Sequence, residues 1–394
     1  MNKKIRIGLV LSSVPGYSET FFKSKINGLV KNGFYVALFA RGNHNRELNC
    51  IHIRPYPVFQ FPLVRVLSVL FIVPFTFLRA PRTILKFWNY ERDRELSSVA
   101  IIKSIYLNAH ILTRKFDWLH FGFATTALGR ENVARAIGAK MAVSFRGYDI
   151  NVYPVKNTSC YTQLWQRVDK VHSISNYLLQ QAYRYGLSTS KPALIITPAL
   201  STPVNPRTGF EFHNPIRVLT VARLTWIKGL EYGIQAIANL KAAGFKVQYI
   251  IVGDGPEYEK LIIETDSLGL TNEIIFAGKL NHEDTLQQMR ECDLYLQPSL
   301  NEGFCNAVLE AQALGCLCIV SNTGALPENV LNNETGWLVQ PRDSNELATI
   351  VMRILKLPVD DRTRISENAK MRAVTTFNLK RHIELWQKFY SVSN

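Results

Sequence analysis

Several common signatures are missing from this 394-residue chain. Its six cysteines form no Cys-x-x-Cys motif and pair with no histidine at metal-ligand spacing, which argues against a zinc site and indicates reduced thiols in a cytoplasm. The dinucleotide pattern G-x-G-x-x-G does not follow the first expected strand, residues 5–11. Helix-turn-helix, zinc-finger and aromatic, arginine-rich patterns are also absent, so we expect no nucleic-acid partner.

Acidic residues are scarce, with 31 Asp and Glu against 46 Lys and Arg. The shortage is local, because residues 1–115 hold 18 basic and only 5 acidic side chains and so carry +13 of the net charge of +15. Charge concentrated in this way indicates an acidic partner. We expect an anionic membrane surface or a phosphorylated substrate.

Long hydrophobic runs are lacking too, and the strongest one covers residues 59–80. Its uncharged core from Val66 to Leu78 is shorter than the roughly 20 apolar residues that span a bilayer, and Pro74 is expected to break it. Two interpretations remain open: a buried helix of the N-terminal domain, or a segment in the membrane interface. The second is favoured by a basic collar around the run, made of Arg65, Arg79, Arg82, Lys86, Arg92 and Arg94.

The length and the pattern of elements indicate two α/β domains. A chain of this size is too long for one ordinary core, and apolar strands alternate with helical stretches throughout, which is typical of doubly wound parallel sheets. Residues 197–215 are rich in Pro, Thr and Asn without apolar periodicity, as in a linker. We therefore expect a Rossmann-like domain over residues 1–200, a linker over 201–215, a second such domain over 216–374, and a terminal amphipathic helix over 375–394.

Most of the chemistry expected of this chain lies in residues 297–328, which read as strand, loop, helix and strand. Glu302 falls in the loop, and Glu310 falls on a helix that otherwise holds small and apolar residues and no cation. The first turn of that helix offers free N–H groups to a phosphate. Arg223 and Lys228 precede another helix, where two cations can neutralise a diphosphate.

These motifs together resemble the retaining GT-B glycosyltransferases of family 4. The resemblance rests on Glu302 and Glu310 as E-x7-E, flanked by P-S, E-G, E-A-x-A-x-G and a later P-E, and on Arg223 and Lys228 as R-x4-K. The spacing of the two glutamates alone is common and would fit two surface or salt-bridged residues better. The resemblance implies two Rossmann-like domains with a cleft between them and a C-terminal helix that crosses back onto the first domain.

It also implies hexosyl transfer from a UDP- or GDP-linked sugar, with retention of configuration. Glu302 then faces the donor sugar, Glu310 takes the ribose hydroxyls, and Lys228 and Arg223 hold the diphosphate. The remaining donor contacts expected from the resemblance and the loop positions are Phe304, Cys305, Asn306, Ala307, Gly253, Lys279, Leu280, Gly324 and Gly16.

The acceptor side follows the family less closely. The family usually carries His-Gly-x-Asp where this chain has Arg146, Gly147, Tyr148 and Asp149. Arg146 either reaches a phosphate or carboxylate of the acceptor or pairs with Asp149. Ser18 and His120 are further candidates on this side, although a histidine such as His120 is more often a buried strand-end residue than a catalyst.

No Asp-x-Asp motif occurs in the chain, so we expect no metal and no cofactor besides the nucleotide sugar. The acceptor expected by analogy is a lipid-diphosphate-linked saccharide in exopolysaccharide, capsule or O-antigen biosynthesis. We expect the protein in the cytoplasm, peripheral on the inner face of the cytoplasmic membrane. Two alternatives remain: a GT-B sugar synthase or epimerase with soluble substrates, and a non-catalytic membrane-binding protein on the same scaffold.

Overall fold

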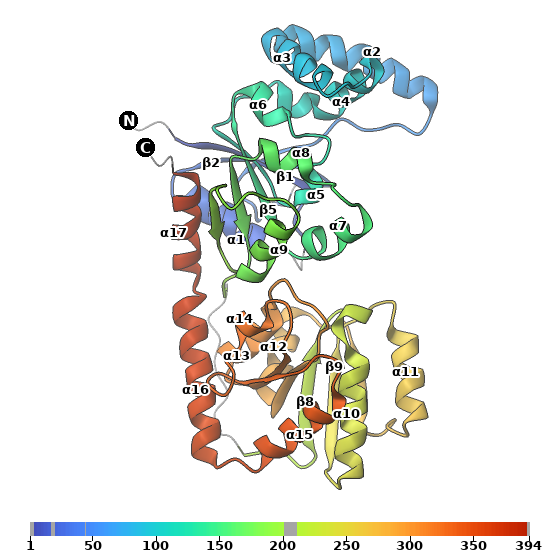
Figure 1. Cartoon of the computed structure of the whole chain (residues 1–394), viewed down its shortest axis with the longest axis vertical. Helices are drawn as coiled ribbons and strands as arrows, with labels where there is room; N and C mark the ends of the chain where they lie inside the picture. The colour runs from blue at the N-terminus through green and yellow to red at the C-terminus, as the bar shows by residue number, and fades with distance from the viewer. Residues whose placement is uncertain (1–3, 17–19, 44, 201–210, 392–394) are drawn as a thin grey trace. The chain divides into compact units, whose positions relative to one another are not determined.

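The computed structural model describes residues 4–16, 20–43, 45–200 and 211–391, and the chain divides into two compact units (Figure 1). Unit 1 consists of Met1–Thr197 with Lys380–Asn394, and unit 2 consists of Pro198–Leu379. Each unit is built around its own parallel sheet, which confirms the expected fold class. Most of the expected linker, residues 201–210, lies outside the described residues.

The sheet of unit 1 has seven strands in the order β3-β2-β1-β4-β5-β6-β7, and every pairing is parallel. Its central strands are buried on both faces, which is why they read as nearly continuous apolar runs in the sequence. The strands are β1 (Arg6–Ser13), β2 (Tyr35–Arg41), β3 (Ile51–Ile53), β4 (Trp118–Phe121), β5 (Lys140–Phe145), β6 (Lys170–Ser173) and β7 (Ala193–Ile195).

Most helices of unit 1 are short. They are α1 (Thr20–Lys31), α2 (Pro62–Arg79), α3 (Pro81–Arg92), α4 (Ser98–Leu112), α5 (Ala124–Ala127), α6 (Val133–Ile137), α7 (Tyr153–Lys156), α8 (Thr162–Arg167) and α9 (Asn176–Arg184), with a π-helical turn at Tyr148–Val152. Two short helices, α5 and α6, occupy the stretch after β4. Gly129 adopts φ +71° and ends the first of two shorter helices there.

The apolar run of residues 59–80 forms α2, which packs against α3 and α4 at one end of unit 1 (Figure 1). The expected break at Pro74 is wrong, and of the two interpretations left open, the buried helix is contradicted. The helix continues through Pro74, and it is not buried, because Thr76 is its only buried residue. By length and composition it is the one helix, among the described residues, that qualifies for crossing a membrane, and only 6% of its apolar window is buried.

The outer surface of α2 is apolar. Large side chains that are at least one third exposed cover it, and we call this set the apolar face of α2: Leu63, Val64, Val66, Leu67, Leu70, Phe71, Phe75, Phe77 and Leu78. The only charged residues in the helix are Arg65 and Arg79, near its two ends. This arrangement is the reverse of a surface helix in a water-soluble protein, whose apolar side faces the core.

The C-terminal helix α17 (Leu379–Tyr390) packs on unit 1. Trp386, Phe389 and Tyr390 join the core beneath β1, β2 and β4. The Trp118 indole donates to the carbonyl of Tyr390 over 3.1 Å, and the buried Lys25 ammonium lies 3.4 Å from the centre of the Trp386 ring. These contacts make the last helix an integral part of unit 1.

Unit 2 has a six-stranded parallel sheet in the order β10-β9-β8-β11-β12-β13. The strands are β8 (Ile216–Val221), β9 (Val247–Val252), β10 (Ile274–Gly278), β11 (Leu294–Gln297), β12 (Leu317–Ser321) and β13 (Trp337–Val339). Two apolar clusters pack on the two faces of the sheet. The helices are α10 (Leu230–Ala242), α11 (Tyr258–Ser267), α12 (His282–Glu291), α13 (Asn306–Ala313), α14 (Leu326–Asn329), α15 (Ser344–Leu355) and α16 (Val359–Thr376), with a 3-10 turn at Trp226–Lys228.

Candidate functional site

The candidate site of unit 2 lies at the carboxyl ends of β8 and β11, two neighbouring strands from which the chain continues in opposite directions across the sheet. Ligands of doubly wound sheets bind at such a switch point. The loops pack closely here. A Cβ atom on Gly253 would lie 1.9 Å from the carbonyl oxygen of Ala222, and Gly253 has φ +138°, so only glycine fits.

Lys228 and Glu302 form an ion pair at this edge. Lys228 ends the 3-10 turn after β8, whereas Glu302 lies in the loop after β11, and their side chains are 15% and 11% exposed. Burial disfavours the charged form of Lys228, but the Glu302 carboxylate outweighs it and raises the lysine pKa above its usual value. The fold thus brings together two residues expected to act on one donor.

A buried relay of hydrogen bonds orients the Glu302 carboxylate. The Ser299 hydroxyl donates to Glu302 Oε1 over 2.9 Å, and the Gln297 amide donates to Ser299 Oγ over 2.8 Å. The Tyr295 hydroxyl in turn donates to Gln297 Oε1 over 3.0 Å. The sequence analysis missed these residues. Their signal is a polar side chain at every second position, which places all three on one side of β11 and its extension.

The remaining diphosphate candidates surround this pair. Arg223 is exposed in the loop after β8. Its charge opposes the protonated form of Lys228, so the two cations are close enough to interact. The N-terminus of α13 carries no side-chain cap, and Asn306 and Ala307 supply its first N–H groups. Two cations and a helix N-terminus are a suitable environment for a diphosphate.

Glu310 has a partner that the sequence analysis did not foresee. His282, the first residue of α12, places its Nε2 atom 3.0 Å from Glu310 Oε1. The hydrogen bond with Glu310 raises the pKa of His282, which favours the imidazolium form. Both side chains are partly exposed, at 42% and 28%. Glu310 therefore keeps oxygen lone pairs available to a ligand at the surface of unit 2.

The loop that contains Gly324 packs directly on the backbone of Glu302. The Ala325 N–H donates to the Glu302 carbonyl over 2.9 Å, and the Thr323 hydroxyl donates to the Leu300 carbonyl over 3.1 Å. Gly324 adopts φ +58°, and a Cβ atom there would lie 2.4 Å from the Glu302 carbonyl oxygen. Gly324 therefore supports the position of Glu302 through its lack of a side chain.

Phe304 and Cys305 are buried, so only their backbone can face a ligand. The Phe304 ring packs against Phe377 with 5.5 Å between centroids. Asn329 brackets the backbone of Cys305, accepting from its N–H and donating to its carbonyl, each over 3.1 Å. Burial raises the pKa of the Cys305 thiol to about 12, which makes it a poor nucleophile.

The other expected donor contacts are in other loops of the chain. Lys279 is exposed just after β10, and Leu280 is half-buried against the apolar cluster of that face. Gly16 is exposed in the loop after β1 and belongs to unit 1. Ser18 lies outside the described residues.

On the acceptor side, Asp149 is a structural residue. Its carboxylate is buried and accepts from the N–H groups of Arg146 and Gly147, over 2.9 and 3.1 Å, and from that of Ala124 over 3.0 Å. It thereby fixes the turn that follows β5. Arg146 is half-buried, and its guanidinium lies 3.7 Å from the centre of the Phe21 ring.

His120 does not face an acceptor, because its side chain has no exposed surface. Its Nε2 atom lies 2.7 Å from the Ser144 hydroxyl, and its Nδ1 atom lies 2.5 Å from the Tyr390 hydroxyl. Burial and then the charge of Lys25 lower the pKa of His120 well below its usual value. His120 is therefore a neutral core histidine that ties β4 to β5 and to α17.

Comparison with known proteins finds a family that unit 2 resembles. Residues 203–372 match the family described as "Glycosyl transferases group 1". Over 267 residues the chain is 28% identical to WcaL of Escherichia coli, named as a colanic acid biosynthesis glycosyltransferase. That alignment covers 66% of each protein, so the chain spans just under two thirds of the length of this relative.

Solved structures extend the likeness to the whole fold. The sucrose-phosphate synthase of Thermosynechococcus elongatus superposes with a TM-score of 0.71 at 18% identity, covering 98% of both chains. HepE of Anabaena, solved with UDP and glucose, superposes with a TM-score of 0.69 at 18% identity and the same coverage. The chain therefore has the two Rossmann-like domains of the GT-B fold, and its residues 203–372 match the group 1 glycosyl transferase family.

Proposed function

We propose that this protein transfers a sugar, with retention of configuration, from a nucleotide sugar to a saccharide acceptor held at a membrane. The observation that carries the proposal is the Lys228–Glu302 ion pair at the switch point of a group 1 glycosyl transferase domain. Lys228 is a partly buried cation, and separate hydrogen bonds orient the Glu302 carboxylate beside it. Such fixed charges are suited to stabilising the charges that develop in a transition state.

In the proposed reaction the cations act on the leaving group. Lys228, Arg223 and the first N–H groups of α13 neutralise the charge that develops on the departing diphosphate. Lys228 contacts both the Glu302 carboxylate and, in this proposal, the diphosphate. Glu302 is therefore close to the anomeric carbon, which is bonded to that diphosphate. In this proposal Lys228, Arg223 and the N-terminus of α13 neutralise the diphosphate as a metal ion does in other transferases, and no metal or further cofactor takes part.

Glu302 orients the donor sugar and stabilises positive charge at its anomeric carbon. The bond from that carbon to the phosphate oxygen breaks while the acceptor oxygen bonds to the same face, and the acceptor proton passes to the departing phosphate oxygen. Glu310, with His282 beside it, accepts from the ribose hydroxyls of the nucleotide. No protein nucleophile is needed, which is consistent with the buried, unreactive Cys305.

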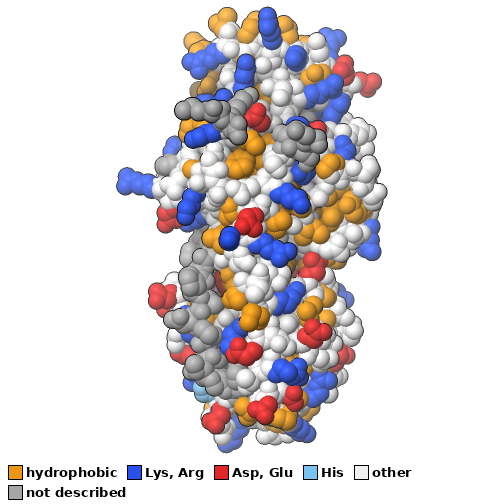
Figure 2. Space-filling model, turned by 90° about the vertical axis from the view of Figure 1, so that its left-hand side faces the viewer, with side chains coloured by type: hydrophobic (Ala, Val, Ile, Leu, Met, Phe, Trp, Pro, Cys, Tyr) orange, Lys and Arg blue, Asp and Glu red, His pale blue; other side chains and the backbone are white. Residues whose placement is uncertain are grey.

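The acceptor is proposed to be a lipid-linked saccharide because unit 1 offers a membrane-binding surface. The apolar face of α2 is exposed, and Arg82, Lys86 and Arg92 are exposed on the neighbouring α3. Figure 2 shows apolar and basic side chains together at the top of the view, in the part of unit 1 where Figure 1 places α2 and α3. Apolar area flanked by cations matches the interface of an anionic bilayer.

One member of the basic collar has a different role. Arg94 is half-buried and forms ion pairs with Glu91 and Glu131, over 3.1 and 3.2 Å. The collar available to lipid therefore consists of the other five residues. The similar protein WcaL is named for colanic acid biosynthesis. Together with this surface, its name supports the proposal that the chain is a cytoplasmic protein that binds the inner face of the membrane and extends a surface polysaccharide.

Nucleotide binding provides the first test, measured as thermal stabilisation by UDP and by GDP. At 100 times its Kd a ligand adds about 2.7 kcal/mol, and for a domain of this size we expect Tm to rise by roughly 5 to 10 °C. Lys228→Ala should abolish the rise, whereas Lys356→Ala, at the exposed end of α15, should keep it. If neither nucleotide changes Tm, the alternative of a non-catalytic membrane-binding protein is favoured.

A further inference from the structure

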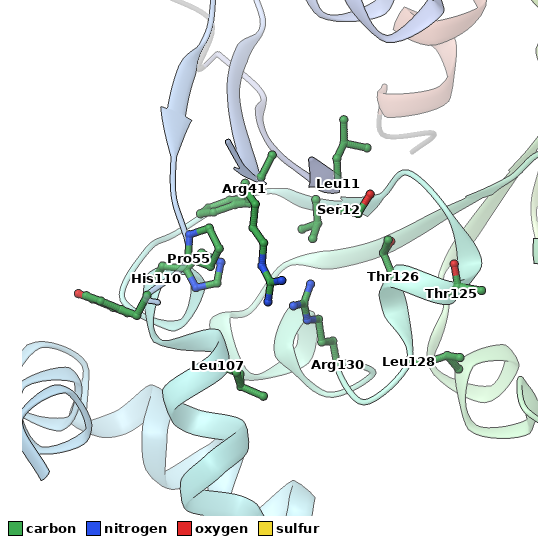
Figure 3. A pocket seen from close by; sticks show the side chains of 14 residues that line it. Leu11, Ser12, Arg41, Pro55, Leu107, His110, Thr125, Thr126, Leu128 and Arg130 are labelled. Atoms are coloured by element: carbon green, nitrogen blue, oxygen red, sulfur yellow. The ribbon is translucent and has the colours of Figure 1, made fainter. Parts of the chain in front are cut away.

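A pocket lies in unit 1, at the carboxyl ends of β1 and β2 (Figure 3). Its walls come from four parts of unit 1: the ends of the two strands, the segment after β3, the last turns of α4, and residues 125–130 after β4. The strand β1 is the switch point of this sheet, because the chain passes from it to β2 on one side and later to β4 on the other. Ligands are expected at this position in a doubly wound sheet.

Two arginines dominate the pocket. Arg41 ends β2 and is exposed, whereas Arg130 follows α5 and is half-buried, and their guanidinium groups point toward one another (Figure 3). No Asp or Glu is among the described residues that line the pocket, and no ion pair of either arginine is found in the described part of the chain. Burial and then the charge of Arg41 lower the pKa of Arg130. An anion between the two groups would replace this repulsion with attraction.

His110 adds an unsatisfied polar group to the same pocket. It lies on α4, is 7% exposed, and its Nδ1 atom has no hydrogen-bond partner among the described residues. Burial, together with the charges of Arg130 and Arg114, lowers its pKa to about 3, so the ring is neutral at physiological pH. A buried polar atom without a partner is costly and indicates a ligand or water at that position.

The size and the surroundings of the pocket restrict the ligand. Its volume of about 270 Å³ is below the roughly 300 to 1,000 Å³ of pockets that enclose a whole drug-sized ligand, so it suits a head group. Pro55 and Tyr56 form one wall, and the chain continues from them to α2 at Pro62. Leu107 and His110 form another wall on α4, against which α2 packs. The pocket thus shares its supporting elements with the apolar face of α2.

We propose that Arg41 and Arg130 bind the phosphate or diphosphate group that joins a saccharide acceptor to its lipid. This rests on the proposed transfer to a membrane-held acceptor and specifies the chemistry of that acceptor. The two guanidinium groups form charge-assisted hydrogen bonds to the phosphate oxygens. In this proposal the lipid chain lies in the bilayer beside the apolar face of α2, and the phosphate group lies between the two arginines. The saccharide extends from the phosphate group, away from the lipid.

The test compares vesicles of neutral phosphatidylcholine with the same vesicles containing a small fraction of polyprenyl diphosphate, in a flotation assay with the full chain. The wild type should bind the diphosphate vesicles ~10-fold or more tightly than the plain ones, as expected for two charge-assisted contacts. The Arg41→Gln/Arg130→Gln variant should lose this preference. Arg184→Gln, which removes an exposed arginine of α9 outside both the pocket and the basic collar, should retain it.

Two additions keep the test decisive. Arg41→Glu changes an exposed side chain and should fold normally, yet it should also remove the preference. Inorganic pyrophosphate should not abolish the preference at concentrations comparable to the lipid if the lipid-borne diphosphate is the ligand, and should abolish it if free phosphates are the natural ligand.

The outcomes separate this inference from the proposed function. If the Arg41 and Arg130 variants keep the preference for diphosphate vesicles, or if Arg184→Gln loses it equally, the pocket assignment is overturned. Thermal stabilisation by UDP or GDP involves unit 2 and should persist in the arginine variants. A wild type that prefers diphosphate vesicles but shows no response to nucleotides would support the pocket and contradict sugar transfer.

Discussion

Lys228→Ala and Glu302→Gln are each expected to lower the rate of sugar transfer by ~10²-fold or more, the usual loss when one partner of transition-state charge is removed. Lys228→Ala removes the cation from the leaving diphosphate. Glu302→Gln keeps the shape of the side chain and its hydrogen bond from Ser299 but removes the negative charge that faces the sugar. The measurement is kcat for release of the nucleoside diphosphate in the presence of acceptor.

Matched variants distinguish this role from a structural one. Because the Lys228–Glu302 pair is mostly buried, Lys228→Ala leaves a carboxylate without its cation and also lowers stability. Lys228→Arg restores the charge and should recover much of the rate, whereas Lys356→Ala should have no effect. A Lys228→Ala enzyme that remains folded and transfers sugar at the rate of the wild type would disprove the assignment of the diphosphate.

The second large effect concerns the membrane. Phe71→Glu/Leu78→Glu is expected to weaken binding to anionic vesicles by ~10²-fold or more, because burial of each of these side chains contributes about 1.5 to 3 kcal/mol. Both residues are on the apolar face of α2, where they are 78% and 79% exposed, so the folded chain should tolerate the change. Binding is measured by flotation with vesicles that contain phosphatidylglycerol.

The control for this variant is Ile263→Glu, which places a charge on an apolar residue of α11 in unit 2 that is 69% exposed. It should bind vesicles as the wild type does. Raising the salt concentration should weaken binding of the wild type, since the basic collar contributes through screened charge. Unchanged binding by the α2 variant would favour the alternative of a synthase or epimerase that acts on soluble substrates.

The sequence predicts the fold well because parallel strands that are buried on both faces leave a strong apolar signal. It also indicates that Lys228 and Glu302 lie near each other, since each follows a strand and the carboxyl ends of parallel strands meet at one edge. It does not reveal what supports them. The relay that orients Glu302 runs through the side chains of Ser299, Gln297 and Tyr295. These side chains meet only because β11 and the loop after it hold them in one row, which is seen only in the folded structure.

Other features depend on contacts between distant segments and escape sequence patterns altogether. Arg41 and Arg130 belong to no motif, and only the packing of β2 beside the segment after β4 reveals that they face each other. His282 likewise meets Glu310 across two helices. His120 resembled a site residue because it ends a central strand, but its side chain points into the core. Pro74 does not end α2 despite its strong local preference.

The central claim, that this chain is a nucleotide-sugar transferase with its donor site in unit 2, is tested most directly by donor hydrolysis. Purified protein is incubated with UDP- and GDP-linked sugars, and release of the nucleoside diphosphate is followed over time. The account predicts release from at least one of these donors by the wild type, and a ~10²-fold slower release by Glu302→Gln. Release at equal rates by both proteins, or none from any donor with or without lipid-linked acceptor, would contradict it.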